Sequence, residues 1–260
     1  MLSKNQLKHL TSLQQKKYRD LYGEFLAEGE KSVSELLGST IEVKEVFALG
    51  NWLKENGDLV LKFSINFQEI SPDELSRISS FKTPNKVVAV AAIPKQNKRT
   101  SDMFSDLILA LDNIRDPGNL GTIIRTADWF GIRHIVCSPG CVDTYNPKVV
   151  QSSMGSITRS DIHYCDLAEF IRTAPAGMVT YGCLLEGRNI HTIQLKTPAI
   201  IIIGNESNGI SDDLLPLISE RLRIPSFSNS NETFSQAESL NASLANAIVC
   251  YEFRRRLTIT

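Results

Sequence analysis

Two glycine-containing polar turns hold the residues of this sequence that could act on a phosphate-bearing ligand. The first turn, Asp112–Gly121, follows an apolar stretch and carries Asn119. Arg125 lies six residues later, near the start of a helix predicted over 122–130. Backbone N–H groups and the helix dipole favour an anion at such a place. A guanidinium there can hold a phosphate bidentately, or it can simply solvate the helix surface.

The second turn, Gly204–Gly209, comes directly after five consecutive apolar residues, Ala199–Ile203. Such a run is typical of a strand that is buried on both faces. Open α/β sheets bind ligands at the carboxyl ends of their strands, although an ordinary polar turn also fits this position. A further short strand is predicted over 222–224. The last helix places four large residues on one face: Leu240, Leu244, Ile248 and Tyr251.

The familiar catalytic and cofactor motifs are absent from the sequence. There is no P-loop, no H-E-x-x-H and no G-x-S-x-G, and Gly118 and Gly121 give only part of a dinucleotide-binding fingerprint. Cys137 and Cys141 lie four apart, but no further cysteine pair or histidine supports a zinc site, so we expect no metal. Five cysteines, an odd number, argue against a disulfide framework.

Composition places few limits on function. The 260 residues carry 28 basic and 29 acidic side chains, a net charge of −1, which neither indicates nor excludes a nucleic-acid partner. Basic clusters at Lys16–Arg19 and Arg254–Arg256 fit RNA contacts or solvated surfaces equally well. The apolar runs are too short to span a membrane, and the polar N-terminus does not resemble a signal peptide, so we expect a cytoplasmic protein.

The predicted elements divide into two domains. Alternating helices and strands over residues 1–94 predict a small α/β domain, whose strands include 60–67 and 86–93. Residues 95–105 are polar and charged and are interpreted as a linker. Residues 106–260 contain buried strands at 107–111, 133–137, 178–184 and 199–203 with helical connections, including a helix over 146–153. These elements predict a mostly parallel sheet.

Three stretches, taken in order, resemble the motifs of the SpoU (TrmH-like) family of RNA ribose 2′-O-methyltransferases in the SPOUT superfamily. They are Asn119–Ala127, Gly204–Ser211, and Ile224-Pro225 followed by Ala237–Ser243. This resemblance covers Asp106 to about Arg256. The front domain resembles the family's substrate-binding domain, of ribosomal-protein L30e-like shape, through three segments: Lys17–Arg19, Phe25–Gly29 and Val87–Ile93.

The resemblance implies an α/β fold whose second domain combines a parallel sheet with a deep trefoil knot. It implies S-adenosylmethionine as cofactor, held by backbone around Gly204, Ile224 and Leu240, and it implies a homodimer. Arg125 would handle the ribose 2′-hydroxyl, either as the base or as a clamp on an RNA phosphate while another group takes the proton. The residues that would support this site are Asn119, Glu206, Ser239 and Asn241.

The sequence departs from the family pattern in the loop Ser226–Gln236, which is longer than usual and has no glycine. We expect this loop to order on binding cofactor or RNA. The predicted activity is methyl transfer to structured RNA, ribosomal rather than transfer RNA, because the front domain suits recognition by shape. A non-catalytic RNA-binding protein is the main alternative, and a dinucleotide-binding enzyme is a weaker one.

Overall fold

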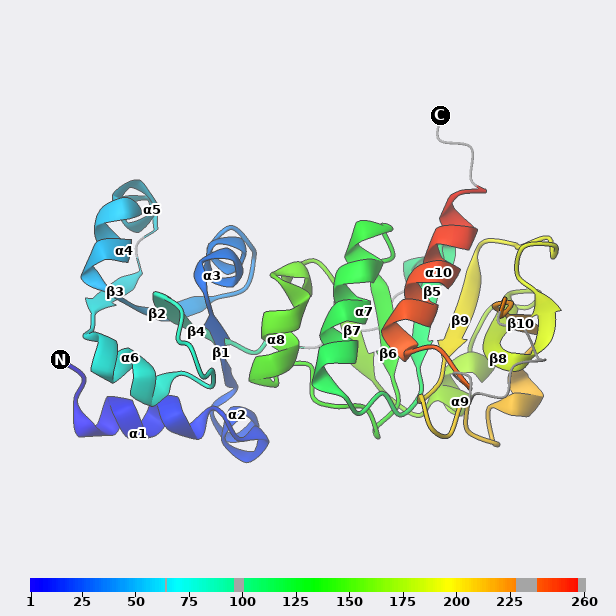
Figure 1. Ribbon diagram of the computed structural model, residues 1–260, viewed down its shortest axis with the longest axis horizontal. Coiled ribbons are helices and arrows are strands. Elements are labelled where there is room, and N and C mark those ends of the chain that lie inside the picture. The colour runs from blue at the N-terminus through cyan, green and yellow to red at the C-terminus, as the bar shows by residue number, and fades with distance from the viewer. Residues whose placement is uncertain (64, 96–100, 228–237, 257–260) are drawn as a thin grey trace. The chain divides into compact units, whose positions relative to one another are not determined.

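The computed structural model describes residues 1–63, 65–95, 101–227 and 238–256 (Figure 1). The internal contacts of the chain divide it into two compact units. The first unit is Met1–Gln96 with Asp143–Arg159, and the second is Asn97–Val142 with Ser160–Thr260. Residues 143–159, which the sequence analysis placed in the second domain, therefore group with the first unit.

The first unit is built on a four-stranded sheet in the order β1-β4-β2-β3, in which only β2 and β3 are parallel among the paired strands. Leucines 10 and 13 lie on one side of this sheet with Leu75 and Ile78, and they pack against apolar strand residues such as Phe47 and Val88. The elements are α1 (Lys4–Ser12), α2 (Lys16–Tyr22), β1 (Glu24–Glu28), α3 (Glu30–Leu37), β2 (Val43–Ala48), α4 (Gly50–Glu55), α5 (Gly57–Lys62), β3 (Asn66–Glu69), α6 (Pro72–Ile78), β4 (Val87–Ala92), α8 (Pro147–Ser153) and η2 (Ser156–Thr158).

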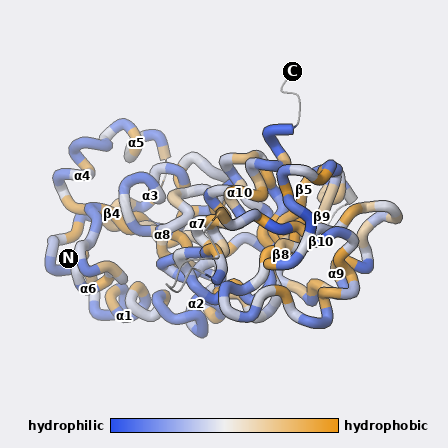
Figure 2. Tube along the Cα trace, turned by 45° about the vertical axis from the view of Figure 1, so that its right-hand side comes forward, coloured by the Kyte–Doolittle hydropathy of each residue, from blue (hydrophilic) through white to orange (hydrophobic). Residues whose placement is uncertain are grey.

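The second unit is built on a six-stranded sheet in the order β10-β8-β9-β5-β6-β7, and all of its strand pairs are parallel. The central strands β5 and β9 are buried at every position, and Figure 2 shows hydrophobic residues around the labels β5, β8 and β9 as well as on several helices. Each fully buried Ile contributes about 1.5–3 kcal/mol. The elements are η1 (Ser101–Ser105), β5 (Leu107–Leu111), α7 (Pro117–Trp129), β6 (His134–Cys137), β7 (Asp161–Tyr164), α9 (Leu167–Arg172), β8 (Val179–Asn189), β9 (Ala199–Ile203), η3 (Leu215–Leu217), β10 (Glu220–Arg223) and α10 (Ala242–Arg254).

Helices cover both faces of the six-stranded sheet. Ile108, Ile200 and Ile202 point to one face, where they form a core with Phe170 of α9 and Leu214. The opposite face is covered by α7 and α10, which lie side by side in Figure 1. Phe253 of α10 meets the ring of Tyr181 edge-on at 5.1 Å. The predicted α/β fold with a parallel sheet is thus confirmed, whereas the trefoil knot stays a prediction.

Three element predictions need correction. The strand predicted over 60–67 is wrong, because helix α5 runs to Lys62 and β3 begins only at Asn66. Apolar residues at alternate positions did not outweigh the helix start at Gly57, where Asp58 suits the positive end of the helix dipole. The strand predicted over 178–184 is too short, because β8 runs on to Asn189. The helix predicted over 122–130 begins earlier, at Pro117, because Asp116 caps it.

Candidate active site

The site lies at the carboxyl edge of the six-stranded sheet. Strands β5 and β9 are parallel neighbours, and Leu111 pairs with Ile203 at their ends. The N–H of Asp112 donates to the carbonyl of Ile203 at 2.9 Å, which keeps the two following loops together. As a result, residues more than 80 positions apart in the chain meet at this edge.

A chain of hydrogen bonds joins the three predicted motifs. The amide nitrogen of Asn119 donates to the Glu206 carboxylate, and the Asn241 amide donates to Asn119 Oδ1 at 2.9 Å. Asn119 is also fixed through its backbone, because its N–H donates to the Asp116 carboxylate at 2.8 Å. Asn241 is held as well, because its Oδ1 accepts from the Ser243 N–H at 3.0 Å and caps α10. Three of the predicted site residues therefore form one fixed polar cluster.

A second network anchors the loop that carries Glu206, and sequence reasoning missed it. Asp112 is 2% exposed. Its carboxylate accepts from the N–H and the hydroxyl of Ser211, each at 2.7 Å, and from the Asn113 amide at 2.8 Å. Asn113 has a left-handed backbone with φ 54°, which turns its carbonyl to accept from Asn205 Nδ2 at 2.9 Å. The available signal was a carboxylate placed directly after a fully apolar strand, where an unpaired charge is too costly to bury.

The loop after β9 closes tightly on itself. Asn205 and Gly209 exchange two backbone hydrogen bonds of 2.9 Å, and Asn205 Oδ1 accepts from the Ser207 N–H at 2.9 Å. A Cβ on Gly204 would lie 2.4 Å from the backbone of Gly209, which only glycine avoids. The turn itself therefore requires glycine at 204, and its tip, residues 207–209, is exposed.

Two predicted residues lie apart from the polar cluster. Arg125 on α7 is exposed and makes no hydrogen bond or ion pair with any residue that the structure describes. Ser239 is also exposed and has no contact with Asn119 or Glu206 among the described hydrogen bonds. The structure thus joins Asn119, Glu206 and Asn241 and leaves the Arg125 guanidinium available to a ligand.

The predicted cofactor residues Ile224 and Leu240 flank the same edge. Ile224 follows β10 and Leu240 precedes α10, so neither belongs to a strand or a helix. The N–H groups of these two residues make no backbone hydrogen bond to another described residue. The long loop predicted to order on binding spans 226–236, and its residues 228–236 lie outside the described part of the chain.

Cys141 anchors the segment that follows β5. Cys141 Sγ accepts from the Ile114 N–H at 3.3 Å and donates to the Leu111 carbonyl at 3.2 Å. A hydrogen bond with Cys137 lowers the pKa of Cys141, whereas the same bond and burial raise the pKa of Cys137. All five thiols are free.

Within the described ranges, no cluster of His, Cys, Asp or Glu could hold a metal ion, and no helix could span a membrane.

Comparison with known proteins places this geometry in context. The SpoU rRNA methylase family matches residues 106–251, and an MRM3-like substrate-binding domain matches residues 4–89. The chain is 32% identical to the 23S rRNA (guanosine(2553)-2′-O)-methyltransferase RlmP of Bacillus subtilis, over 97% of each protein.

Two solved structures are also similar over nearly the whole chain. One is an rRNA methyltransferase from Sinorhizobium meliloti with bound AdoMet, at 29% identity and a TM-score of 0.81, covering 99% of this chain and 97% of that one. The other is the SpoU methyltransferase AviRb from Streptomyces viridochromogenes, also with AdoMet, at 25% identity and a TM-score of 0.82. It covers 98% of each chain.

Proposed function

Because the chain belongs to the SpoU rRNA methylase family, we propose that it transfers a methyl group from S-adenosylmethionine to a ribose 2′-hydroxyl of ribosomal RNA. The observation that carries this proposal is the hydrogen-bond chain from Glu206 through Asn119 to Asn241. It draws the three motifs into one polar cluster, and Asn119 of this cluster lies on the same helix as Arg125, which has no partner among the described residues. Such an arrangement suits a reaction that depends on positioning a weak nucleophile.

The loops at the carboxyl edge fit S-adenosylmethionine. Its adenine and amino-acid groups need backbone donors and acceptors, and Ile224 and Leu240 offer N–H groups that are not used elsewhere in the described chain. The turn from Gly204 to Gly209 gives this edge a fixed shape, because the Gly209 backbone packs where a side chain of residue 204 would lie. We assign these three residues to cofactor binding. The cofactor supplies a methyl group on a positively charged sulfur.

Arg125 is assigned to the RNA. A guanidinium is a poor base and a good bidentate donor, so a role as phosphate clamp fits the exposed Arg125 better than a role as free base. Two parallel hydrogen bonds to one phosphate would fix the neighbouring ribose and its hydroxyl. Asn119 and Glu206 would hold the loop that faces this ribose, and Ser239 is a further polar group at the start of α10. The proton acceptor is then a group other than Arg125.

Ribosomal RNA is favoured over transfer RNA. The relative RlmP is named for methylation of 23S rRNA, and it matches 97% of this chain, so the match extends into the first unit. We propose that residues 1–94 form the RNA-binding domain, joined through 95–105 to the methyltransferase domain 106–260. A ribosomal substrate would also place the enzyme in the cytoplasm.

The proposal is tested with S-adenosylmethionine carrying a labelled methyl group. Purified protein is incubated with a 23S rRNA transcript or with unmodified transfer RNA, and label in each RNA is counted. We expect label in the 23S transcript alone. Label in transfer RNA alone would contradict the assignment of ribosomal RNA as the substrate. Label in neither RNA would favour a non-catalytic RNA-binding protein.

We further propose that the enzyme is a homodimer through an apolar surface of α7 and α10. The apolar face of α10 that the sequence predicted includes Leu244 and Tyr251. This face points outward, because Leu244 is 56% and Tyr251 54% exposed. Trp129 at the end of α7 is 84% exposed, and Leu240, just before α10, is 46% exposed. Single apolar side chains are ordinary on a surface, but a contiguous group marks an interaction site.

A second copy of the chain is the simplest occupant of this surface. A self-complementary patch forms a closed dimer, and this patch ends at Leu240 beside the polar cluster, so the partner would border the site. Analytical ultracentrifugation should show a dimer for the wild type and a monomer for Leu244→Asp. A dimer that survives this substitution would contradict the assignment.

A further inference from the structure

We propose that one face of α2, formed by Lys17, Tyr18, Leu21 and Tyr22 and called here the α2 face, binds RNA through a phosphate and an unpaired base. The inference rests on the proposed RNA substrate and assigns a specific contact surface in the first unit. It concerns residues of one short helix, far in sequence from the polar cluster of the second unit.

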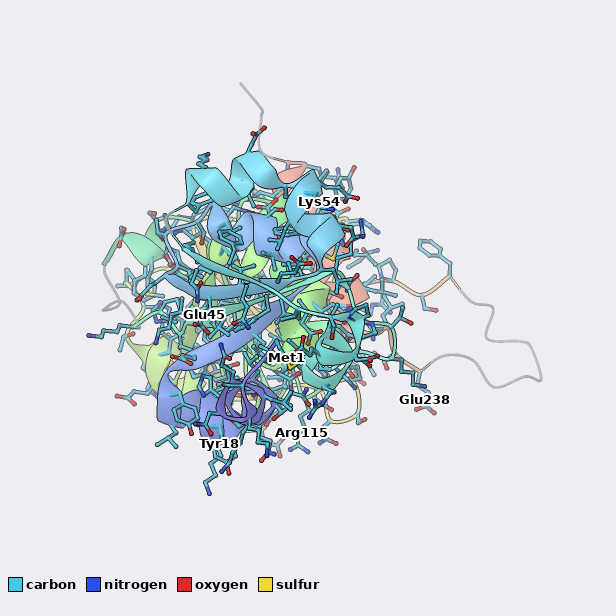
Figure 3. All side chains as sticks on the ribbon, turned by 90° about the vertical axis from the view of Figure 1, so that its left-hand side faces the viewer. Met1, Tyr18, Glu45, Lys54, Arg115 and Glu238 are labelled. Carbon is cyan, nitrogen blue, oxygen red and sulfur yellow. The ribbon has the colours of Figure 1, made fainter. Side chains whose placement is uncertain are left out.

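The α2 face is a continuous strip of two helical ridges. Residues 17 and 21 are four apart, as are 18 and 22, so each pair lies on the same side of the helix. The rings of Tyr18 and Tyr22 stack with centroids 6.2 Å apart and an interplanar angle of 16°, and Figure 3 labels Tyr18 at the lower edge of the molecule. Leu21 beside them is 67% exposed. An apolar and aromatic surface is thus presented to solvent.

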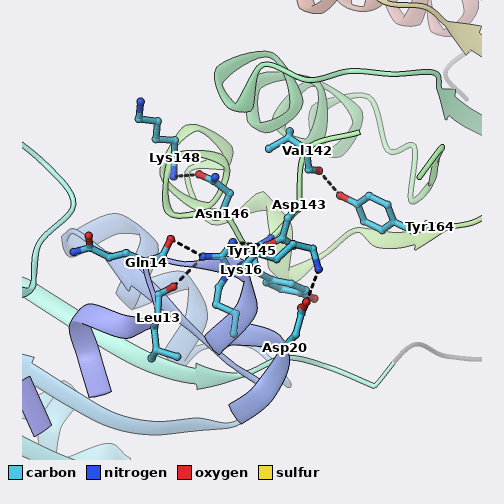
Figure 4. Close-up of polar contacts among 11 residues, drawn as sticks. Leu13, Gln14, Lys16, Asp20, Val142, Asp143, Tyr145, Asn146, Lys148 and Tyr164 are labelled. Carbon is cyan, nitrogen blue, oxygen red and sulfur yellow. Dashed lines mark hydrogen bonds and ion pairs between the residues drawn. The ribbon is translucent and has the colours of Figure 1, made fainter. Parts of the chain in front are cut away.

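Lys17 supplies the positive charge of the α2 face. The Lys17 ammonium lies 5.7 Å from the centroid of the Tyr18 ring and forms no ion pair with any described residue. The neighbouring Lys16, by contrast, is paired with Asp20 at 2.6 Å (Figure 4). A phosphate can therefore reach Lys17 without first displacing a carboxylate.

The helix is held as a rigid platform from its opposite side. Arg19 is 2% exposed, and its guanidinium donates to the carbonyls of Leu13 and Gln14 at 2.9 Å and to Asp143 at 3.0 Å through Nε. Gly23 ends the helix with φ 64°, and its N–H donates to the Arg19 carbonyl at 2.8 Å. Because these contacts fix α2, binding on its outer face orders little additional chain.

The ring of Tyr22 is held in place by His9. The His9 ring meets Tyr22 at 4.7 Å and 67°, so Tyr22 is supported from behind while 45% of it stays exposed. Aromatic rings next to a lysine suit single-stranded RNA, whose bases stack on aromatic side chains while its phosphates meet cations. The combination of charge and stacking surface favours RNA over an apolar protein segment.

Binding of the full-length protein to a 23S rRNA transcript tests the proposal, with Tyr22→Ala, Tyr22→Phe and Lys17→Ala as variants and Lys54→Ala as a control. Lys54 is an exposed lysine of the same unit, on α4. We expect Tyr22→Ala to weaken binding about 5- to 150-fold, the range for loss of one stacked base, and Tyr22→Phe to retain affinity. Log K falls as log salt rises, and Lys17→Ala should make this fall shallower by about 1 in slope. Lys54→Ala should change neither quantity.

The outcomes separate this inference from the proposed function. If the wild type methylates the transcript but Tyr22→Ala and Lys17→Ala bind it like the wild type, the α2 face is not an RNA surface. If Tyr22→Phe is as weak as Tyr22→Ala, the effect is not stacking and the inference is also overturned. If the wild type neither binds nor methylates ribosomal RNA, the proposed substrate itself is wrong. Thermal unfolding of each variant confirms that the fold is intact.

Discussion

Replacing Asp112 by Asn should loosen the loop 204–211, which we propose binds the cofactor, without changing the size of the side chain. The Asp112 carboxylate accepts three hydrogen bonds, two from Ser211 and one from Asn113. The introduced amide keeps one acceptor oxygen, so the two bonds from Ser211 can weaken from about 1.5–3 kcal/mol for a charged acceptor to about 0.5–1.5 kcal/mol for a neutral one. The bond from Asn113 is lost altogether, because an amide N–H stands where the second carboxylate oxygen accepted it. We therefore expect the free energy of unfolding to fall by about 4 kcal/mol.

The same substitution should weaken cofactor binding, because Ser211 and Asn113 fix the turn that begins at Gly204. Calorimetry with S-adenosylmethionine should show a Kd at least about tenfold higher, which corresponds to about 1.4 kcal/mol. Asp213→Asn is the matched control, since Asp213 is an exposed carboxylate of the same loop region. Lower stability with an unchanged Kd would refute the link between this network and the cofactor. An unchanged stability would refute the energetic reasoning itself.

Three further predictions concern single side chains. Arg19→Ala should lower the free energy of unfolding by about 3–5 kcal/mol in urea titrations, because it leaves buried partners unpaired, whereas Lys16→Ala, at an exposed ion pair, should cost less than about 1 kcal/mol. Gly204→Ala should abolish cofactor binding in calorimetry, because its Cβ would collide with backbone, whereas Gly57→Ala, which points into open space, should not. Burial, with a smaller contribution from a nearby carboxylate, raises the pKa of Tyr145 to about 12. The neutral phenol is thus favoured in the folded state, so its stabilisation is complete below about pH 10 and is lost as the pH rises toward 12. Tyr145→Phe should remove that part of the alkaline loss in unfolding midpoints, and an unchanged pH profile would contradict it.

Features set by local pattern could be predicted from the sequence. Strands β5 and β9 are five-residue apolar runs followed by polar turns, and such short bounded runs are typical of buried parallel strands. The helix start at Asn146-Pro147 was correct, because a capping side chain followed by proline fixes a helix start locally. The positions of Asn119, Glu206 and Asn241 followed from a resemblance to a family, not from physics.

Features set by distant contacts could not be predicted. Asp112 and Ser211 are 99 residues apart, and only the pairing of β5 with β9 brings them together. The last helix shows the same limit. Its periodicity revealed a face with Leu244 and Tyr251, but the buried face is another one that carries Asn246 and Phe253. The periodicity of a helix sequence shows which residues share a face, and the packing of neighbouring elements decides which face is buried.

The most direct test of the account is to locate the transferred methyl group. Labelled 23S rRNA is digested to nucleosides, and the account predicts that the label lies on a ribose 2′-oxygen. Arg125→Ala should bind S-adenosylmethionine as the wild type does and yet transfer no methyl group. Label on a base, or full transfer by Arg125→Ala, would contradict the account.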